Sequence, residues 1–378
     1  MNPSLTVGAP PNRILFAFLL AFLTGCRESE SASQIVIGHT MPADSASERQ
    51  AIRLELDRLN ADSPIPGLRW GAVHADAGHN PEQNLAQANR LTAVNRVHVL
   101  IGGMSSAHAD RLGQVASSEP ILAMTLAESL MSPTQTWQFC LGISPADRGR
   151  ALARLARDEL RFNRIAVVRS SEEAPSKCLE AFRAELILGK GAMTEVVVSK
   201  DKGIDDIAAT VRASACDGVF VAVADPAAAL RVLKALKVAE SIPVLFGEDE
   251  LARQALSDGG LGKSPVFAVS AWGDDETHLT ESARLWRKGW IEKYQQPPDA
   301  AAVLVTDAVR VLAQAIGKTG TFAPYRVKDE LLKPGQTWTG VAGPLRFDGG
   351  QACHRTAFVL RWDGSAWKTH SRLEAAQE

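Results

Sequence analysis

From Gln34 onward, short apolar runs alternate with longer amphipathic ones. Short runs rich in β-branched residues predict buried strands, whereas apolar residues three and four positions apart predict helices. The first half of this region contains predicted strands at 35–38, 68–75, 97–101 and 121–125, with helices at 48–60, 81–91 and 107–116. Strict alternation of strands and helices is typical of a doubly wound parallel sheet.

The same pattern restarts after Phe139 and predicts a second lobe. Its helices are expected at 148–160, 176–188, 204–214 and 226–236, and its strands at 165–168, 193–198, 218–223 and 243–246. A strand at 266–270 then leads back to two long helices, 282–294 and 300–316, which we expect to cover the first lobe. Closing strands are predicted at 344–347 and 357–362. The predicted fold class is α/β, with two doubly wound Rossmann-like lobes.

The amino terminus has the features of an export signal. Arg13 precedes an unbroken apolar run from Ile14 to Leu23, which is too short for a spanning helix of about 20 residues. The next residues complete the tetrapeptide Leu23-Thr24-Gly25-Cys26, which resembles the bacterial lipobox. That resemblance implies a signal peptide at 1–25, lipidation of Cys26 and a polar tether at 26–33.

We therefore expect an exported lipoprotein anchored in a membrane and facing the periplasm or the cell exterior. Arg27, rather than the aspartate that retains lipoproteins in the inner membrane, leaves outer-membrane sorting open. The alternative, a buried cysteine in an ordinary helix, is disfavoured because Gly25 and the polar tether would end such a helix.

Charge and composition limit the kinds of molecule that the protein is expected to bind. The chain has 41 Lys+Arg against 43 Asp+Glu and no basic block, so nucleic acid is not an expected partner. The eight histidines are scattered, without CxxC, CxxH or HExxH spacing, and we predict neither a metal site nor a cofactor. The part after the tether, roughly 345 residues, is long enough for two domains.

Four stretches together resemble the type I periplasmic binding-protein superfamily, in particular the leucine-binding-protein-like substrate-binding proteins of branched-chain amino-acid ABC transporters. They are Ile35–Gly38, Val73–Asp76 with Asn80-Pro81 and Ala86–Leu91, Leu100–Ser106, and Thr306–Val309 followed by Leu312–Ile316. The resemblance implies a Venus-flytrap arrangement with three crossings, near 139–144, 266–272 and 338–347. Lobe 1 would then comprise 34–143 plus 272–338, and lobe 2 would comprise 144–271 plus 339–378.

In doubly wound sheets, ligands bind beyond the carboxyl ends of the strands. The loop Gly102-Gly103-Met104-Ser105-Ser106 follows such a strand, and its backbone N–H groups and the hydroxyls of Ser105 and Ser106 could hold a carboxylate. The alternative is a glycine turn with serine as a plain helix N-cap. The resemblance implies that Ser106 is the carboxylate-binding serine.

The resemblance also implies roles for loops of both lobes. Ala127 and Ser129 match the small residue and the hydroxyl that contact the ligand after the fourth strand. Asp249, or Glu248 beside it, matches the acid that faces the ligand ammonium, although an acidic loop can equally be a solvated surface. The loops that begin at Ser170 and contain Ala224 also lie beside the expected ligand.

Three positions depart from the family pattern: Ser47, Ala174 and Ala224 stand where amino-acid binders place aromatic lids. This disfavours a leucine-like ligand and favours a larger, more polar or differently shaped one. The predicted function is to close two lobes over a small polar ligand, such as an amino acid or a related carboxylate or amide, and to deliver it to an ABC permease.

The sequence allows two alternatives to a transport function. The first alternative is a ligand sensor or an envelope-docking lipoprotein of the same fold with an altered pocket. An enzyme is disfavoured because the chain has no GxSxG, P-loop or metal motif, and Cys353-His354 in the tail is the one adjacent pair of reactive residues.

Cys140, Cys178, Cys216 and Cys353 are an even number in a compartment that permits disulfides, and they allow three pairings. In the resembled fold the crossings run side by side, which favours Cys140–Cys353. Cys178–Cys216 would then lie within the second lobe.

Overall fold

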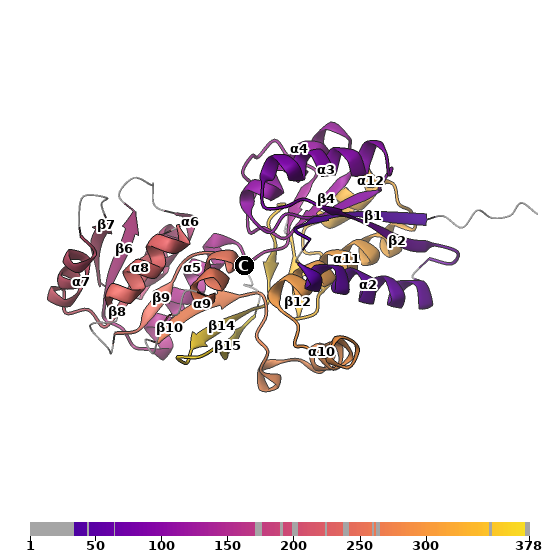
Figure 1. Ribbon diagram of the computed structural model, residues 1–378. Coiled ribbons are helices and arrows are strands. Elements are labelled where there is room, and N and C mark those ends of the chain that lie inside the picture. The colour runs from indigo at the N-terminus through magenta and orange to yellow at the C-terminus, as the bar shows by residue number, and fades with distance from the viewer. Residues whose placement is uncertain are drawn as a thin grey trace, which may run out of the picture.

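The computed structural model describes residues 34–374, except 44, 64, 171–175, 190–191, 199–202, 224, 237–241, 259–260, 262–264 and 348–349. Figure 1 shows two α/β lobes side by side, joined at a narrow waist where segments from the middle and the late parts of the sequence (magenta, orange and yellow) meet. The predicted arrangement of two α/β lobes is confirmed.

The first lobe has a five-stranded parallel sheet in the order β2-β1-β3-β4-β5. Its strands are β1 (Gln34–Met41), β2 (Arg69–Asp76), β3 (Val99–Gly102), β4 (Leu122–Thr125) and β5 (Gln138–Cys140). Its own helices are α2 (Ala46–Ala61), α3 (Pro81–Ala93) and α4 (Ser106–Ser118). The crossover helices keep all strands parallel, as the alternation in the sequence predicts.

Three later helices also join this lobe: α10 (Glu281–Tyr294), α11 (Ala300–Thr319) and α12 (Pro324–Leu331). The prediction that late helices cover the first lobe is confirmed, since α11 packs against α2 and Tyr294 Oη donates to Gln50 O at 2.9 Å. By length and composition α11 could cross a membrane, but 83% of its most apolar window is buried within the protein, as in a core helix.

The second lobe has a seven-stranded sheet in the order β15-β14-β10-β9-β8-β6-β7. Its strands are β6 (Arg164–Ser170), β7 (Ala192–Val198), β8 (Gly218–Ala222), β9 (Val244–Phe246), β10 (Val266–Ser270), β14 (Ala357–Trp362) and β15 (Trp367–Leu373). Its helices are α5 (Pro145–Arg154), continued by a π-helical turn (Leu155–Glu159), α6 (Lys177–Leu188), α7 (Ile204–Ala213), α8 (Pro226–Leu236) and α9 (Glu250–Asp258). β10 is parallel to β9 but antiparallel to β14, so a late hairpin completes this lobe.

The third crossing lies later than the sequence suggested. Residues 338–347 do not pass between the lobes. β11 (Trp338–Thr339) contacts α11 of the first lobe. The ring centroids of Phe347 and of Phe139 in β5 are 5.2 Å apart, so Phe347 also packs against the first lobe. The apolar side chains of Trp338 and Phe347 are fully buried there. With β12 (Pro344–Arg346) and β13 (His354–Arg355), β11 forms a small sheet, and the chain enters the second lobe at Ala357.

The predicted disulfides are wrong, since the four cysteines in the described part of the chain are all free. Cys140 and Cys353 are backbone neighbours, with Cys353 N donating to Cys140 O at 3.0 Å. Their thiols have different partners: Cys140 Sγ accepts from Thr125 Oγ1 at 3.5 Å, and Cys353 Sγ donates to His354 O at 3.6 Å. Cys178 and Cys216 pack against opposite faces of the second sheet, because they join the clusters that contain Val167 and Val168, respectively.

Candidate functional site

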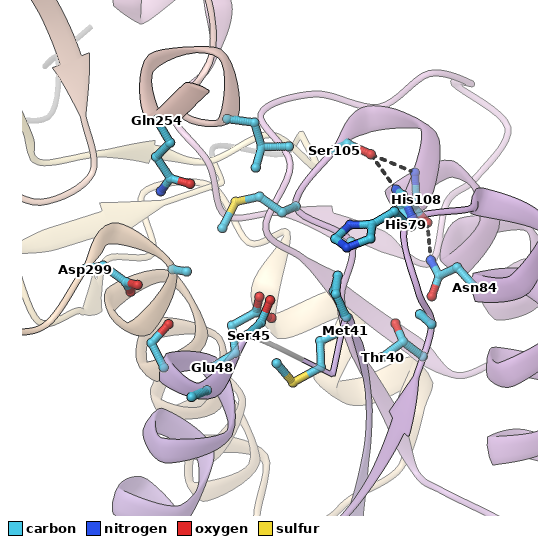
Figure 2. Close-up of a pocket in the computed structure, with 18 of the residues that line it drawn as sticks. Thr40, Met41, Ser45, Glu48, His79, Asn84, Ser105, His108, Gln254 and Asp299 are labelled. Atoms are coloured by element: carbon cyan, nitrogen blue, oxygen red, sulfur yellow. Dashed lines mark hydrogen bonds between the residues drawn. The ribbon is translucent and has the colours of Figure 1, made fainter. Parts of the chain in front are cut away.

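A cavity of about 510 Å³ lies in the cleft between the lobes, beyond the carboxyl ends of β1, β2 and β3. Residues of the first lobe form most of its wall, and Leu251 and Gln254 of α9 close it from the second lobe. The remaining lining residues are Thr40, Met41, Pro42, Ser45, Ala46, Ser47, Glu48, Ala77, His79, Asn84, Gly103, Met104, Ser105, His108, Gln296, Asp299 and Ala301. Figure 2 shows these side chains converging from several elements.

One end of the cavity is the start of α4. Gly102 has φ +145°, and a Cβ there would lie 2.2 Å from Thr40 O, so only glycine fits this turn. Ser105 caps the helix: its Oγ accepts from His108 N at 3.3 Å and lies 2.7 Å from His108 Nδ1. Burial, with the charge of His79, lowers the pKa of His108, which favours its neutral form.

Three buried polar atoms on this side have no hydrogen-bond partner among the described residues: Thr40 Oγ1, Asn84 Oδ1 and His108 Nε2. The Asn84 side chain is held in place because its Nδ2 donates to His108 O at 2.9 Å. Buried polar groups are nearly always paired. The unsatisfied atoms are therefore concentrated where a ligand or ordered water would be expected.

The other end of the cavity is acidic. Glu48 is only 5% exposed, and its Oε2 lies 3.1 Å from Nε2 of the fully buried His39. His39 Nδ1 in turn lies 3.0 Å from His74 Nδ1, and burial together with His39 lowers the pKa of His74 to about 4. Asp299 lines the same end and caps α11 by accepting from Ala302 N at 2.8 Å. The two carboxylates give this end a negative potential.

The cleft narrows towards the crossings into a space of about 10 Å³. Here Arg148 of α5 donates through Nη1 to Glu128 of the β4–β5 loop, and through Nε to Gly247 O at 3.0 Å. Burial raises the pKa of Glu128 to about 7, against the opposing effect of Arg148. Charges of the protein itself therefore occupy the inner end of the cleft.

The predicted site residues are distributed unevenly over these two regions. Ser105 lines the main cavity, and Ser106 is the first residue of α4 beside it. Asp249 lines the inner space, where its Oδ1 also accepts from Ala252 N at 2.9 Å. Glu248 adjoins Arg148, whose pKa it helps to raise.

None of the other predicted residues that the structure describes lines the main cavity. Ala127 O accepts from Gly142 N at 3.0 Å, and neither Ala127 nor Ser129 lines the cavity. Ser170 ends β6 in the second lobe. Ala224 and Cys26 lie outside the described residues. The ligand roles of all these residues stay predictions.

Sequence reasoning missed Glu48, His79, Gln254 and Asp299. His79 follows β2, and Glu48 lies in the first turn of α2 after β1, so both stand beyond carboxyl ends of strands. That rule could have selected them. Gln254 and Asp299 come from segments whose placement over the cavity depends on how the lobes pack.

Comparisons with known proteins agree with this architecture. The family model for periplasmic binding proteins matches residues 40–366. No curated protein is similar enough in sequence to match. One similar solved structure is the leucine-binding protein LivK from Thermotoga maritima, with 16% identity and a TM-score of 0.68, covering 90% of this chain and 99% of that one.

Two further structures are similar. A substrate-binding protein from Desulfitobacterium hafniense in complex with Leu has 18% identity and a TM-score of 0.72, covering 89% of this chain and 100% of that one. A solute-binding protein from Rhodopseudomonas palustris BisB5, in complex with 3,4-dihydroxybenzoic acid, has 16% identity and a TM-score of 0.67, covering 91% of this chain and 98% of that one. At this identity they establish the fold, whereas the family model spans most of the sequence. The chain therefore belongs to the periplasmic binding protein family.

Proposed function

We propose that the main cavity binds a small solute with a carboxylate at one end and a hydrogen-bond donor or ammonium group at the other, such as an amino acid or a related carboxylate or amide. The observation that carries this proposal is the opposition of two ends across one cavity. Ser105 and the start of α4 lie at one end, and Glu48 and Asp299 lie at the other (Figure 2). Helix N-termini favour anions, and carboxylates favour cations.

The size and lining of the cavity support this class of solute. A volume of about 510 Å³ falls within the usual range for small-molecule sites. Apolar contacts are available from Met41, Met104 and Leu251, but no Phe, Tyr or Trp is among the described residues that line it. A ligand that relies on stacking against aromatic rings is therefore disfavoured.

A thermal-shift screen followed by calorimetry tests the proposal. Neutral amino acids, their amides and benzoates should be compared at equal concentrations. A solute at about 100 times its dissociation constant stabilises the folded protein by about 2.7 kcal/mol, which is readily measured. Stabilisation by benzoates alone, or by no member of the panel, would contradict the proposal.

Two variants on the same helix locate the site. Glu48→Gln should weaken binding of the best solute at least tenfold, because the buried acid at the end of the cavity loses its charge. Asp57→Asn also removes a carboxylate from α2, but Asp57 pairs with Lys293 outside the cavity and should leave affinity unchanged. Equal affinities of Glu48→Gln and the parent would move the site elsewhere.

We further propose that the chain works outside the cytoplasm, anchored through Cys26, and delivers its solute to an ABC permease. Its family membership and the lipobox-like tetrapeptide support this proposal. Deleting the gene should abolish uptake of the solute by intact cells, and expression from a plasmid should restore it. Unchanged uptake by the deletion strain, with binding intact, would favour the sensor or docking alternative.

A further inference from the structure

Carboxylates from both lobes meet at the inner end of the cleft. Glu128 belongs to the first lobe. Glu248 and Asp249 lie between β9 and α9 in the second lobe, and Glu250 is the first residue of α9. Besides burial, the charges of Asp249 and Glu250 act on Glu128 and favour its protonated form, raising its pKa. Arg253 pairs with Glu250 inside the second lobe, but without a further cation Glu128 would lie unpaired beside Asp249 of that lobe.

Arg148 supplies that cation. Its side chain is 5% exposed, and Nε is fixed to its own lobe by the bond of 3.0 Å to Gly247 O. Nη1 reaches across the cleft to Glu128 of the first lobe. Glu248 adds a further negative charge beside the guanidinium. One side chain therefore connects the two lobes beside the first crossing.

A solute has no room to take the place of this contact. The surrounding space of about 10 Å³, lined also by Met104, Leu251 and Leu304, is about the volume needed for one water molecule. The interlobe pair can therefore be present whether the main cavity is filled or empty.

We propose that Arg148 is an interlobe strut: by neutralising the carboxylates that meet at the inner end of the cleft, it fixes how far apart the lobes stand. It is a positioning residue, because it reaches the solute cavity only through the lobe arrangement. Buried ion pairs contribute little net stability, but removing one partner leaves the other charge without compensation. The strut acts in the solute-free protein and thus goes beyond the proposed function.

Double electron–electron resonance, which measures the distance between two spin labels, tests the strut. Labels at Val94→Cys in the first lobe and Leu188→Cys in the second use positions that are 70% and 80% exposed, in a Cys216→Ser background. In solute-free protein, Arg148→Met should shift the distance distribution most, because Glu128 then loses both its hydrogen bond across the cleft and the positive charge opposite it. Glu128→Gln should shift it less, and the double variant should return towards the parent.

A matched control breaks a buried ion pair within one lobe. Glu55 is 1% exposed and pairs with Arg310 between α2 and α11, so Glu55→Gln should lower stability without altering the distance distribution. Parent-like distributions in both Arg148→Met and Glu128→Gln would overturn the strut. Should Arg148→Met not fold, the distribution of Glu128→Gln decides alone.

A second measurement uses the best solute from the screen and rests on the proposed function. If only the parent lobe arrangement binds, reducing its population to about one tenth should raise the apparent dissociation constant about tenfold. Weaker binding by Glu128→Gln, with an altered distance distribution, supports the strut. If the parent protein binds no solute but Glu128→Gln alters the distance distribution, the proposed function is contradicted and the strut is not. If Glu128→Gln binds solute normally and keeps the parent distance distribution, the strut is contradicted and the proposed function is not.

Discussion

Replacing Arg355 by methionine should be among the most destabilising single changes in the described part of the chain. Arg355 ends the small sheet at the waist and is buried, with its Nη2 donating to Asp307 Oδ2 of α11 at 2.7 Å. Its Nη1 donates to Leu141 O of the first crossing at 3.0 Å. Methionine is unbranched and somewhat shorter, so it would remove these bonds and fill most of the space with apolar atoms.

The magnitude follows from the burial of both partners, since the side chains of Asp307 and Arg355 are 0% and 2% exposed. Without Arg355, the carboxylate of Asp307 keeps the bond from Val341 N at 2.6 Å but loses its buried counter-charge. Breaking such a pair on one side typically costs about 3–5 kcal/mol of unfolding free energy. Burial already raises the pKa of Asp307 against the effect of Arg355, so the variant should be destabilised more at pH 8 than at pH 5.

Urea unfolding followed by circular dichroism measures this free energy. The double variant Asp307→Asn with Arg355→Met keeps an acceptor for Val341 N but no buried charge, and it should be more stable than Arg355→Met alone. Glu292→Gln, which breaks an exposed pair with Lys288, should change stability by less than about 1 kcal/mol. The reasoning is refuted if Arg355→Met costs under about 1 kcal/mol, or if the double variant is less stable than the single one.

Three further predictions concern the anchor, the cavity and the waist. Cys26→Ser should appear in the soluble fraction or persist as precursor on immunoblots of fractionated cells, and a processed, membrane-bound Cys26→Ser protein would rule out lipidation. Ser105→Ala should lower solute affinity in calorimetry and, by loss of the α4 N-cap, lower unfolding stability by about 1 kcal/mol; unchanged values for both would contradict its assigned contacts. Burial alone would raise the pKa of Asp147, but hydrogen bonds from His354, Ser144 and Arg150 outweigh it and lower the pKa to about 2 from 3.8. The resulting stabilisation of about 2 kcal/mol is complete above pH 3.8 and is lost as the pH falls through 2, so acid titrations of Asp147→Asn should lack this loss.

Most strands and helices could be predicted because each buries an apolar run against a neighbour of the same lobe. The elements missed were short or partly polar. β15 reads Trp-Lys-Thr-His-Ser-Arg-Leu, and its place at the sheet edge explains the polar residues. α9 begins directly after the acidic loop at Glu248-Asp249. The sequence predicts this loop as a ligand contact or a solvated surface, whereas Asp249 also caps the helix. β11 and β13 have two residues each, too few for any periodicity.

Site residues could be predicted only where the order of strands and helices alone places them at the cleft. Ser105 follows a parallel strand and starts a helix, so its place at the cleft followed from sequence position. The partnership of Glu128 with Arg148 joins residues of two lobes and depends on how the side chains point, which no local pattern encodes. The cysteines illustrate the same limit, because Cys140 and Cys353 are adjacent in the backbone while their thiols have separate partners.

The late hairpin of the second lobe has a consequence for how the chain is made and exported. β10 lacks its antiparallel neighbour until residues 357–362 are available, and β14 lacks its own neighbour until 367–373 follow. During synthesis the second sheet therefore keeps an unpaired edge until residue 373 has emerged from the ribosome. A chain that folds outside the cytoplasm gains time from this order, since its second sheet cannot be completed before residues 367–373 have been made.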